Sequence, residues 1–417
     1  MSKRKSSPAV SNTQPRPNSP VLKVFEAFSG IGAQNAALKS LGMHYKVVGT
    51  SDWFVNAVVA YDALHSDKTE EIEVPSYEEQ LKYLKQFTFS AESQRPAKNL
   101  EGLGSEMIKR LYVAQKRTHN YGSITDIKPE KLPDIDLLIY SFPCQDLSTG
   151  GNGNGMGRGS GTRSSTIWHI GKILRTLKKL GKLPEYLLME NVPAIQSDRY
   201  KVDFRKWKVL LSGLGYKNDR PVVLDASKFG IPQDRVRLFM ASHLKTRLHI
   251  GRRIQQHDWD GNIADFLRLD YSDPRIKAEA DEASLNLTPS RQEMWDINKR
   301  EPPYNELIHT ITCNMDRTQT AALFWYEDRI RRLTIREAYL LMGFSESDYE
   351  KVAKLGFSYR QNNKLIGNAI VVPVLKEVFR AMFQGSRYLP DAVVQEGGGK
   401  PWLTANRHRS PLSSFRR

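Results

Sequence analysis

The sequence predicts an α/β protein built on a parallel sheet. Near the start of the chain, strand and helix patterns alternate: apolar, strand-like runs cover 21–25 and 47–49, and helical patterns cover 34–41 and 55–64. Four more strand-like runs follow at 137–141, 186–189, 221–224 and 236–240. Strands that alternate with helices are typical of a parallel sheet with helices on both faces.

Helical periodicity fills the spaces between the later strands. One amphipathic pattern covers 167–180, and a second places Trp207, Leu210, Leu211 and Leu214 at helical spacing. We expect these side chains to be core residues, because apolar residues at this spacing usually face a sheet or another helix.

Length, cysteine count and charge limit the classes of function. The chain has 417 residues and no apolar run of membrane length, so we expect a cytoplasmic protein with no membrane partner. Its two cysteines, Cys144 and Cys313, predict neither a disulfide framework nor a metal site. The net charge of +16 favours a polyanionic partner, and the alternative is a basic surface that serves only solubility.

Changes in composition divide the chain into parts. The first 20 residues are basic and lack the apolar core of a signal peptide. From about 244 the strand–helix rhythm gives way to a polar, arginine-rich stretch, and helical patterns return after 330. We therefore expect a disordered basic arm (1–20), a main domain (21–243) with a helical insertion (66–120), a small irregular domain (244–330), C-terminal helices (331–388) and a basic tail (389–417).

Cys144 is the first candidate for chemistry. It follows an apolar run at 135–139 and Pro143, which fixes its own φ and so defines how the chain leaves the strand. Open α/β sheets bind ligands beyond the carboxyl ends of their strands, which is where this thiol is placed. The alternative is a buried structural thiol, but the neighbouring motifs favour a functional one.

A glycine-rich turn follows the first predicted strand. Gly30 and Gly32 lie between a strand and a helix, where they let the backbone approach a ligand near a helix N-terminus. Asn35 stands at the third glycine position of the dinucleotide fingerprint, so NAD is disfavoured. The alternative is an ordinary strand–helix turn.

Acidic and aromatic residues around this turn suit a nucleoside. Asp52 ends the second strand, where a carboxylate accepts hydrogen bonds from ribose hydroxyls. Trp53 and Phe28 offer aromatic faces for an adenine ring. We therefore expect a nucleoside ligand other than NAD.

Charged residues mark two later strands. Glu190 ends the strand at 186–189 and would share a crevice with Cys144; the alternative is an ion-paired structural glutamate. Gln233, Arg235 and Arg237 lie on one face of the last strand because strand side chains alternate. Two arginines there would bind a base oxygen or phosphate and lower the pKa of a nearby thiol, unless they belong to a solvated edge strand.

A glycine-rich loop follows Cys144. Glycine occupies every second position from 151 to 161, and Arg158 and Arg163 add positive charge. Such a composition predicts a mobile lid over Cys144, with a flexible linker as the alternative.

These motifs together resemble those of the DNA (cytosine-5) methyltransferases, over residues 22–245 and 330–385. The ordered motifs are FEAFSGIGA, SFPCQDLS, ENV, QDRVR, RRLTIREAYLLMGF and GNAI. The forms SFPCQDLS, RGSGTRS (158–164) and YLLMENV look most like those of bacterial enzymes that methylate CpG.

The resemblance implies a Rossmann-like sheet of the S-adenosylmethionine-dependent type, with 244–330 as a target-recognition domain and 331–388 folding back onto the catalytic domain. It implies that Cys144 adds to carbon 6 of a flipped-out cytosine, whose carbon 5 then takes the methyl group. Glu190 would hold ring nitrogen 3 and the exocyclic amine, and Arg235 and Arg237 would lie near the base oxygen.

The resemblance also carries over binding residues, position by position. For the cofactor these are Phe28, Gly30, Gly32, Asp52, Trp53, Ser123, Ile124, Pro143, Asn368 and Ala369. For the substrate they are Gln145, Ser148, Arg163, Asn191, Gln233 and Thr310. Ser123 stands where the family often has an acidic residue, with Asp126 nearby but shifted, and Ala33 replaces a usual glycine.

The expected partner is double-stranded DNA, and the expected state is a monomer of bacterial or phage origin. A cognate restriction endonuclease is left open. Two other functions are weighed: an RNA methyltransferase of the same fold, and a DNA-binding regulator with a silent site. The populated segment at 244–330 argues against the first, and the intact Cys144, Glu190 and Arg235 argue against the second.

Overall fold

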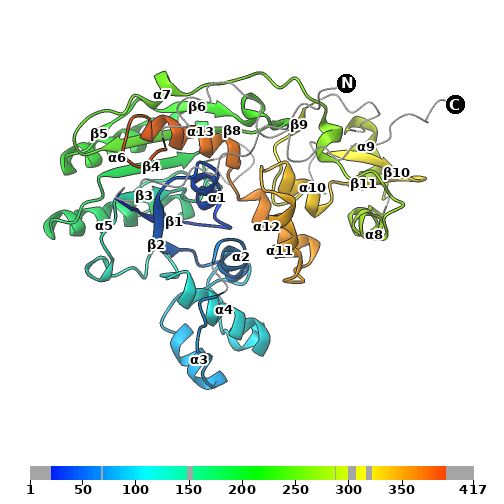
Figure 1. Ribbon diagram of the computed structural model, residues 1–417, viewed down its shortest axis with the longest axis horizontal. Helices are drawn as coiled ribbons and strands as arrows, with labels where there is room; N and C mark the ends of the chain where they lie inside the picture. Colours follow the sequence, from blue (N-terminus) through cyan, green and yellow to red (C-terminus); the bar gives the residue numbers. More distant parts are fainter. Residues whose placement is uncertain are drawn as a thin grey trace, which may run out of the picture.

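The computed structural model describes residues 20–66, 69–147, 154–286, 288–298, 307–315 and 322–390 (Figure 1). Ser148 and the first part of the glycine-rich loop lie outside them, as do the arm at 1–19 and most of the basic tail. Among the described residues, no helix combines the length and the apolar character needed to cross a membrane.

A seven-stranded sheet forms the centre of the molecule. Its order is β2-β1-β3-β4-β8-β5, and β6 also pairs with β8. The strands are β1 (Leu22–Ala27), β2 (Tyr45–Ser51), β3 (Leu137–Tyr140), β4 (Tyr186–Asn191), β5 (Lys217–Asn218), β6 (Val222–Asp225) and β8 (Val236–His243). The predicted parallel arrangement holds for β2, β1, β3 and β4, whereas β8 runs antiparallel to β4, β5 and β6. The short connection from β6 to β8 suits antiparallel pairing, because a parallel crossover needs a dozen or more residues.

Helices cover both faces of this sheet, as predicted. Along β1, Leu22 and Val24 face one core while Phe25 and Ala27 face the other. The first core contains α1 (Ala33–Ser40), α2 (Val55–His65) and α13 (Val372–Phe383), and the second contains α5 (Ile167–Lys179) and α6 (Lys201–Leu214). Trp207 is fully buried in the second core, which agrees with its predicted place.

The hydrogen-bond register aligns the ends of the four parallel strands. Ala27 pairs with Ser51 of β2 and with Tyr140 of β3, and Tyr140 pairs with Met189 of β4. These four residues form one row across the sheet. The residues that follow them therefore leave the sheet at a common edge, which we call the carboxyl edge.

The inserted segment (residues 66–120) is helical and has its own small core. Its main helices are α3 (Tyr77–Leu84) and α4 (Ser105–Arg117), which pack below α2 in Figure 1. Leu81, Leu84, Ile108 and Leu111 form this core with Val55, Val58 and Val59, which lie on the outer side of α2. A capping box between Ser76 and Glu79 starts α3. Because α2 contributes to two cores, the insertion is joined firmly to the sheet domain.

The segment at 244–330 combines short helices with strand pairs. Its elements are α7 (Ile250–Arg253), α8 (Pro274–Ala283), α9 (Pro289–Asn298), β9 (Ile308–His309) and the hairpin β10 (Leu323–Tyr326) with β11 (Arg329–Arg332). β9 pairs in parallel with β7 (Gln233–Asp234). Ile250, Ile263 and Ile308 belong to the first core, so the apolar interior continues across residue 244. The division into domains at 244 and 330 stays a prediction.

Several short 3-10 helices connect these elements: η1 (Glu101–Leu103), η2 (Pro129–Lys131), η3 (Arg163–Thr166), η4 (Pro193–Gln196), η5 (Ala226–Phe229) and η6 (Ile263–Phe266).

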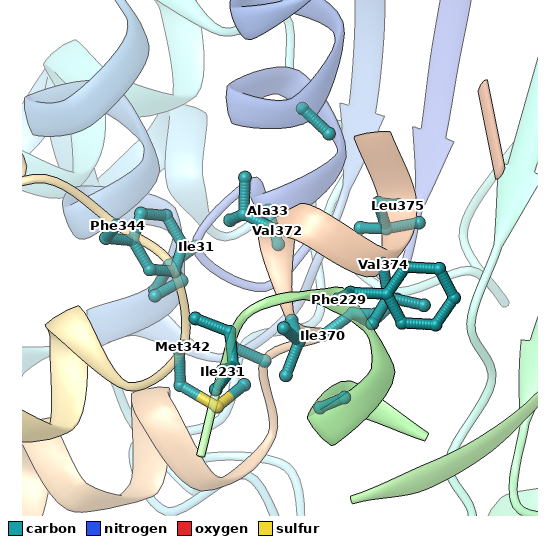
Figure 2. Packing of buried hydrophobic residues seen from close by; sticks show 14 of the residues in the cluster. Ile31, Ala33, Phe229, Ile231, Met342, Phe344, Ile370, Val372, Val374 and Leu375 are labelled. Carbon is teal, nitrogen blue, oxygen red and sulfur yellow. The ribbon is translucent and has the colours of Figure 1, made fainter. Parts of the chain in front are cut away.

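The C-terminal helices return to the start of the chain. They are α10 (Ile335–Leu340), α11 (Glu346–Ala353), α12 (Tyr359–Gly367) and α13. The predicted cap before α10 is present, because Thr334 and Glu337 form a capping box. Figure 2 shows Val372 beside Ala33 of the first strand–helix turn, and Ile31, Ile370 and Val374 belong to the same core. The two ends of the described chain therefore share one core.

A buried ion pair joins the hairpin to α10. Arg331 and Glu337 are both fully buried and form a two-point salt bridge with both N···O distances at 2.8 Å. The remaining acceptor capacity of Glu337 is used by the backbone N–H groups of Arg268 (2.7 Å) and Thr334 (2.8 Å). A salt bridge from which water is excluded is stable only when each of its charged groups has its hydrogen-bond partners.

Replacing Glu337 should therefore destabilise the protein strongly. Glu337→Ala leaves the Arg331 guanidinium buried without a counter-charge, which costs about 3–5 kcal/mol. Urea unfolding followed by circular dichroism should show a lower transition midpoint. Glu327→Ala, which removes the exposed partner of Lys277, is the control and should leave the midpoint unchanged. Equal midpoints for the two variants would contradict a structural role for the buried pair.

Candidate active site at the carboxyl edge of the sheet

Two hydrogen bonds fix the backbone just before Cys144. Asn191 Nδ2 donates to the carbonyl of Phe142 (3.0 Å), and Ser164 Oγ donates to the carbonyl of Pro143 (2.6 Å). Pro143 itself has no N–H to donate and a fixed φ. Cys144 is partly buried against the second core, in contact with the carboxyl edge. The direction of the thiol is therefore determined by its neighbours.

The turn after Cys144 is also held. The backbone N–H of Leu147 donates to the carbonyl of Cys144 (2.9 Å), and the N–H of Ser164 donates to the Asp146 carboxylate (3.1 Å). Gln145 places a buried side-chain oxygen here that has no hydrogen-bond partner among the described residues. An acceptor of this kind is available to a ligand.

The second half of the glycine-rich loop is fastened to the protein. Gly155 donates its N–H to the carbonyl of Asp146 (2.9 Å), Met156 is fully buried, and its carbonyl accepts from Trp168 Nε1 (2.7 Å). Residues 148–153 lie outside the described part of the chain, and so does the predicted substrate contact of Ser148. Closure of this loop over Cys144 stays a prediction, and the described half already has fixed partners.

Glu190 and Arg237 form an ion pair beside the thiol. Glu190 pairs with Phe239 in the register of β4 and β8, so Arg237, two residues before Phe239, is its diagonal neighbour on the same face. Arg237 Nε lies 3.4 Å from Glu190 Oε1, with about a tenth of the Glu190 side chain and a sixth of the Arg237 side chain exposed. The antiparallel register of β4 and β8 thus brings these two charges together.

Burial controls the protonation of both groups. It raises the pKa of the Glu190 carboxyl above its ordinary value, and the positive charge of Arg237 opposes this. Burial also raises the pKa of the Cys144 thiol, with Arg237 again opposing and the Glu190 carboxylate adding to the rise. The arginines do act on the thiol in the predicted direction. The loss of water outweighs them, so the net change in the thiol pKa is the reverse of the prediction.

Arg235 ties three segments together. Its guanidinium donates to the carbonyls of Ile311 (2.7 Å), Gly367 (3.0 Å) and Ala369 (2.7 Å), while its Nε has no described partner. The side chain is almost fully buried. These contacts give Arg235 a positioning task, and its predicted part in catalysis stays a prediction.

Gln233 has similar contacts. It is fully buried, its Nε2 donates to the carbonyl of Leu341 (3.0 Å), and its Oε1 accepts from the N–H of Ile311 (3.0 Å). Both ends of the amide are occupied by the protein. Its predicted contact with substrate stays a prediction, while its observed task is to hold the segment after β9.

The segment after β9 also reaches the carboxyl edge. Thr310 Oγ1 donates to the carbonyl of Asp234 (2.6 Å), and Cys313 Sγ lies 3.3 Å from Asn368 Oδ1. Gly367 has no side chain to separate α12 from this segment. A Cβ added there would lie 2.8 Å from Cα of Cys313 and closer still to its nitrogen. The approach of these two segments therefore requires glycine.

The glycine turn has the geometry of a ligand cradle. Phe28, Gly30 and Gly32 all have positive φ (57°, 54° and 75°), a region that costs Phe28 conformational strain. A Cβ at Gly30 would meet open space, whereas one at Gly32 would lie 2.7 Å from the Tyr61 ring. The turn thus leaves room in front of Gly30 and packs tightly behind Gly32, which fits close approach of a ligand to the backbone at Gly30.

Asp52 faces this turn. Its two carboxylate oxygens accept the N–H groups of Gly30 (2.8 Å) and Phe54 (2.8 Å). Burial raises its pKa, and these backbone donors oppose the rise. Each oxygen keeps a second lone pair for a hydroxyl donor. The residues fit the nucleoside moiety of S-adenosylmethionine at this turn.

The remaining predicted cofactor residues surround the same edge. Trp53 follows Asp52 and is partly buried against the first core. Ile124 is buried in the second core, and Ser123 Oγ lies 2.8 Å from Thr125 Oγ1. Asp126, the shifted acid, accepts the Thr88 N–H (2.7 Å) and so holds the inserted segment. Ala369 is buried and Asn368 exposed at the end of α12.

Two residues that organise the site were not predicted. Ser164 holds Pro143 and Asp146, and its one signal was membership of the RGSGTRS run. Asn120 binds the main chain of Asp52 through its side-chain amide (3.0 Å to both N and O). An isolated asparagine at the end of a helical segment carries no local signal of such a contact. Arg163 begins η3. Burial lowers the pKa of Lys364, and the positive charge of Arg163 contributes to this lowering.

Comparisons with known proteins agree with this geometry. The family model described as C-5 cytosine-specific DNA methylase matches residues 103–384. Type II methyltransferase M2.ScrFI of Lactococcus lactis subsp. cremoris is 32% identical over 87% of this chain and 99% of its own length. Orphan methyltransferase M.SssI of Spiroplasma monobiae is 33% identical over 86% of this chain and 96% of its own. The crystal structure of S. pombe Dnmt2 methyltransferase has the same fold, with a TM-score of 0.57 at 18% identity, covering 88% of this chain and 99% of that one.

The contact at Gly367 generates a prediction on stability. Gly367→Ala should force the backbone at 312–313 away from α12, and overpacking of this kind costs about 1–3 kcal/mol. The thermal midpoint measured by differential scanning calorimetry should fall. Gly213→Ala is a matched control, because Gly213 lies within α6 and its added Cβ would meet nothing. That variant should be neutral or slightly stabilising, and an equal fall in both would contradict the steric account.

Proposed function

This chain belongs to the C-5 cytosine-specific DNA methylase family and is a DNA cytosine-5 methyltransferase; we propose that it methylates a flipped-out cytosine through a covalent bond from Cys144 to carbon 6 of the base. The observation that carries this proposal is the meeting of Cys144, Glu190 and Arg237 at the carboxyl edge, beside the cradle at Gly30 and Asp52.

Glu190 prepares the base for attack. Carbon 6 of cytosine is a weak electrophile, and a proton donated toward ring nitrogen 3 draws electron density away from it. The raised pKa of Glu190 keeps a proton on this carboxyl at a higher pH than an exposed glutamate would hold one. The same side chain can accept a hydrogen bond from the exocyclic amine, which would select cytosine over thymine.

Cys144 then acts as the nucleophile. Its thiolate adds to carbon 6, and the electron pair of the 5,6 double bond moves to carbon 5, which becomes nucleophilic toward a methyl group. After methyl transfer, a base removes the proton from carbon 5 and the thiolate leaves. The raised thiol pKa means that the thiolate is scarce in the free protein. Arg237, within reach of both charges, stabilises the thiolate.

The cofactor we propose is S-adenosylmethionine, which when bound supplies an electrophilic methyl group. Asp52 would accept the ribose hydroxyls, Trp53 and Phe28 would flank the adenine, and the backbone at Gly30 would approach the amino acid part. Ser123, Ile124, Pro143, Asn368 and Ala369 would complete its surroundings. Gly32 would serve by letting the turn pack against α2.

The substrate of the family is DNA, and a target base inside a duplex must leave the stack to reach Cys144. We propose that Gln145, Arg163 and Thr310 face the base or the DNA backbone, and that Asn191 acts through its bond to Phe142. The substrate contact of Ser148 stays a prediction. The excess of positive charge suits a phosphate backbone. Relatives include a type II and an orphan methyltransferase, so the chain could work in a restriction–modification system or alone.

A trapping experiment tests this function. Duplex DNA that contains 5-fluorocytosine in place of cytosine should form a complex with the protein that survives denaturing gel electrophoresis in the presence of radiolabelled S-adenosylmethionine. The adduct persists because fluorine at carbon 5 cannot be removed as a proton is. The complex should carry label, and its crosslinked peptide should contain Cys144 by mass spectrometry.

Three controls accompany the trapping experiment. Cys144→Ser should form no complex on the same DNA, and Cys313→Ser should form one, because only the first thiol reaches the base. Fluorocytosine-containing RNA of the same sequence should give no complex. An adduct of Cys144→Ser would show that the nucleophile is misassigned, and an adduct with RNA alone would favour RNA as the substrate.

The pH dependence of methyl transfer follows from the two raised pKa values. Activity should rise with pH as the Cys144 thiolate forms and fall as Glu190 loses its proton, giving a bell-shaped profile. Arg237→Gln removes a positive charge that lowers both pKa values, so both limbs should move to higher pH. Single-turnover rates across the pH range would measure this. Arg220→Gln, on the exposed surface, should keep the wild-type profile, and an unshifted Arg237→Gln profile would argue against the electrostatic role.

A further inference from the structure

We propose that the inserted segment, residues 66–120, sets the position of the cofactor-binding turn, and that Asn120 is the positioning residue through which it does so. The inference rests on the proposed cofactor site at Gly30, Asp52 and Trp53. It gives the insertion a task in the reaction.

The insertion covers the outer edge of β2. This strand pairs with β1 on one side only. On its other side the N–H of Thr50 donates to the carbonyl of His119 (3.2 Å), and the N–H of Tyr121 donates to the carbonyl of Thr50 (2.9 Å). The end of the insertion thus continues the sheet by one short parallel bridge.

Asn120 extends this pairing with its side chain from Thr50 to Asp52, two residues further along the chain. Its Oδ1 accepts the N–H of Asp52 (3.0 Å), and its Nδ2 donates to the carbonyl of Asp52 (3.0 Å). A side-chain amide that bonds both backbone groups of one residue replaces the neighbouring strand that β2 lacks here. The carboxylate of Asp52 faces the glycine turn, while its main chain is held by the Asn120 amide.

Asn120 also connects two parts of the proposed cofactor site. The same Oδ1 accepts the N–H of Gly122 (3.1 Å), which precedes Ser123 and Ile124. Ser51 Oγ adds a bond to the carbonyl of Gly122 (2.8 Å). Because Asn120 is only 4% exposed, it lies behind these residues and is no direct ligand contact.

A second backbone contact from the insertion, at Ser90, holds the main chain of Trp53. The N–H of Ser90 donates to the carbonyl of Trp53 (2.7 Å), and the N–H of Val55 donates to the carbonyl of Ser90 (3.0 Å). The main chain at Trp53 is therefore held on two sides. Asn120 binds the preceding residue, Asp52, and Ser90 binds the carbonyl of Trp53. The backbone that carries the indole is therefore in place before any ligand binds.

The energetic consequence is preorganisation. A turn held in its binding conformation lets the cofactor bind without ordering Asp52 and Trp53 first. Without the Asn120 amide, the backbone groups of Asp52 lose their partners and the turn gains other conformations. The cofactor would then bind more weakly, while the geometry around Cys144 would stay intact once the cofactor is bound.

The test measures S-adenosylhomocysteine binding to the full chain by isothermal titration calorimetry. Asn120→Ala should raise Kd roughly tenfold, as expected for losing buried hydrogen bonds. Its KM for S-adenosylmethionine should rise in parallel, and kcat at saturating cofactor should stay within about twofold of wild type. This split between KM and kcat distinguishes a positioning role from general damage.

Two further variants complete the design. Ser51→Ala keeps the Asn120 amide and loses one bond to Gly122, so it should give a smaller rise in Kd. If Asn120→Ala does not fold, the Kd of Ser51→Ala is the result that tests the inference. Asn218→Ala is the matched control: its amide bonds Lys208 O and Ser212 Oγ at the opposite sheet edge, so only stability should fall.

The outcomes separate this inference from the proposed function. If the wild-type chain fails to bind S-adenosylhomocysteine, both the cofactor site and this inference are overturned. If the wild type binds and the folded Asn120→Ala and Ser51→Ala variants bind equally well, the inference alone is overturned.

Discussion

Hydrogen-bond register across the parallel strands is the constraint on which the rest of the site depends. Because Ser51, Ala27, Tyr140 and Met189 stand in one row, the chain leaves four strands at the same level. A slip of one residue in any strand would turn its side chains to the other face and move its exit by about 3.3 Å. The register of β1 and β2 shifts once, between Val24 and Phe25, and is regular from there to the carboxyl edge. Asp52, the glycine turn, Cys144 and Glu190 meet because the strand ends are aligned beyond that shift.

Local chemistry made much of this arrangement predictable. Cys144, Glu190, Asp52 and the glycine turn each follow an apolar run, and strand ends gather at one edge of a parallel sheet. Side-chain alternation predicted Gln233, Arg235 and Arg237 on one face of a single strand, and this was wrong. Gln233 belongs to β7, which pairs with β9 in a separate sheet, Arg235 lies between β7 and β8, and Arg237 lies in β8. The tasks of these arginines differ because their distant partners differ: carbonyls near Ile311 and Ala369 for one, a carboxylate for the other. Asn120 and Ser164 were missed for the same reason: the residues next to them in the sequence do not indicate which distant residue they contact.

Burial has different consequences for the Arg331–Glu337 pair and for the Glu190–Arg237 pair. Arg331 and Glu337 are dry, close and satisfied on every side, so their charges stabilise one arrangement of the hairpin and α10. Glu190 and Arg237 are farther apart and retain some exposure. That looser pair leaves a carboxyl whose pKa is raised by burial and a cation with capacity for another anion. The same two residue types thus give a rigid contact in one place and, in the function proposed above, a reactive one in the other.

The packing of α13 against the first strand–helix turn has a consequence for biosynthesis. Ile31 and Ala33 emerge from the ribosome early, yet the residues that cover them, from Ile370 to Leu375, are nearly the last of the core to be made (Figure 2). At typical translation rates the nascent chain waits roughly 20–70 s between the two. During that interval an apolar face is open to chaperones. The turn at Gly30 also lacks part of its packing until α13 has been made.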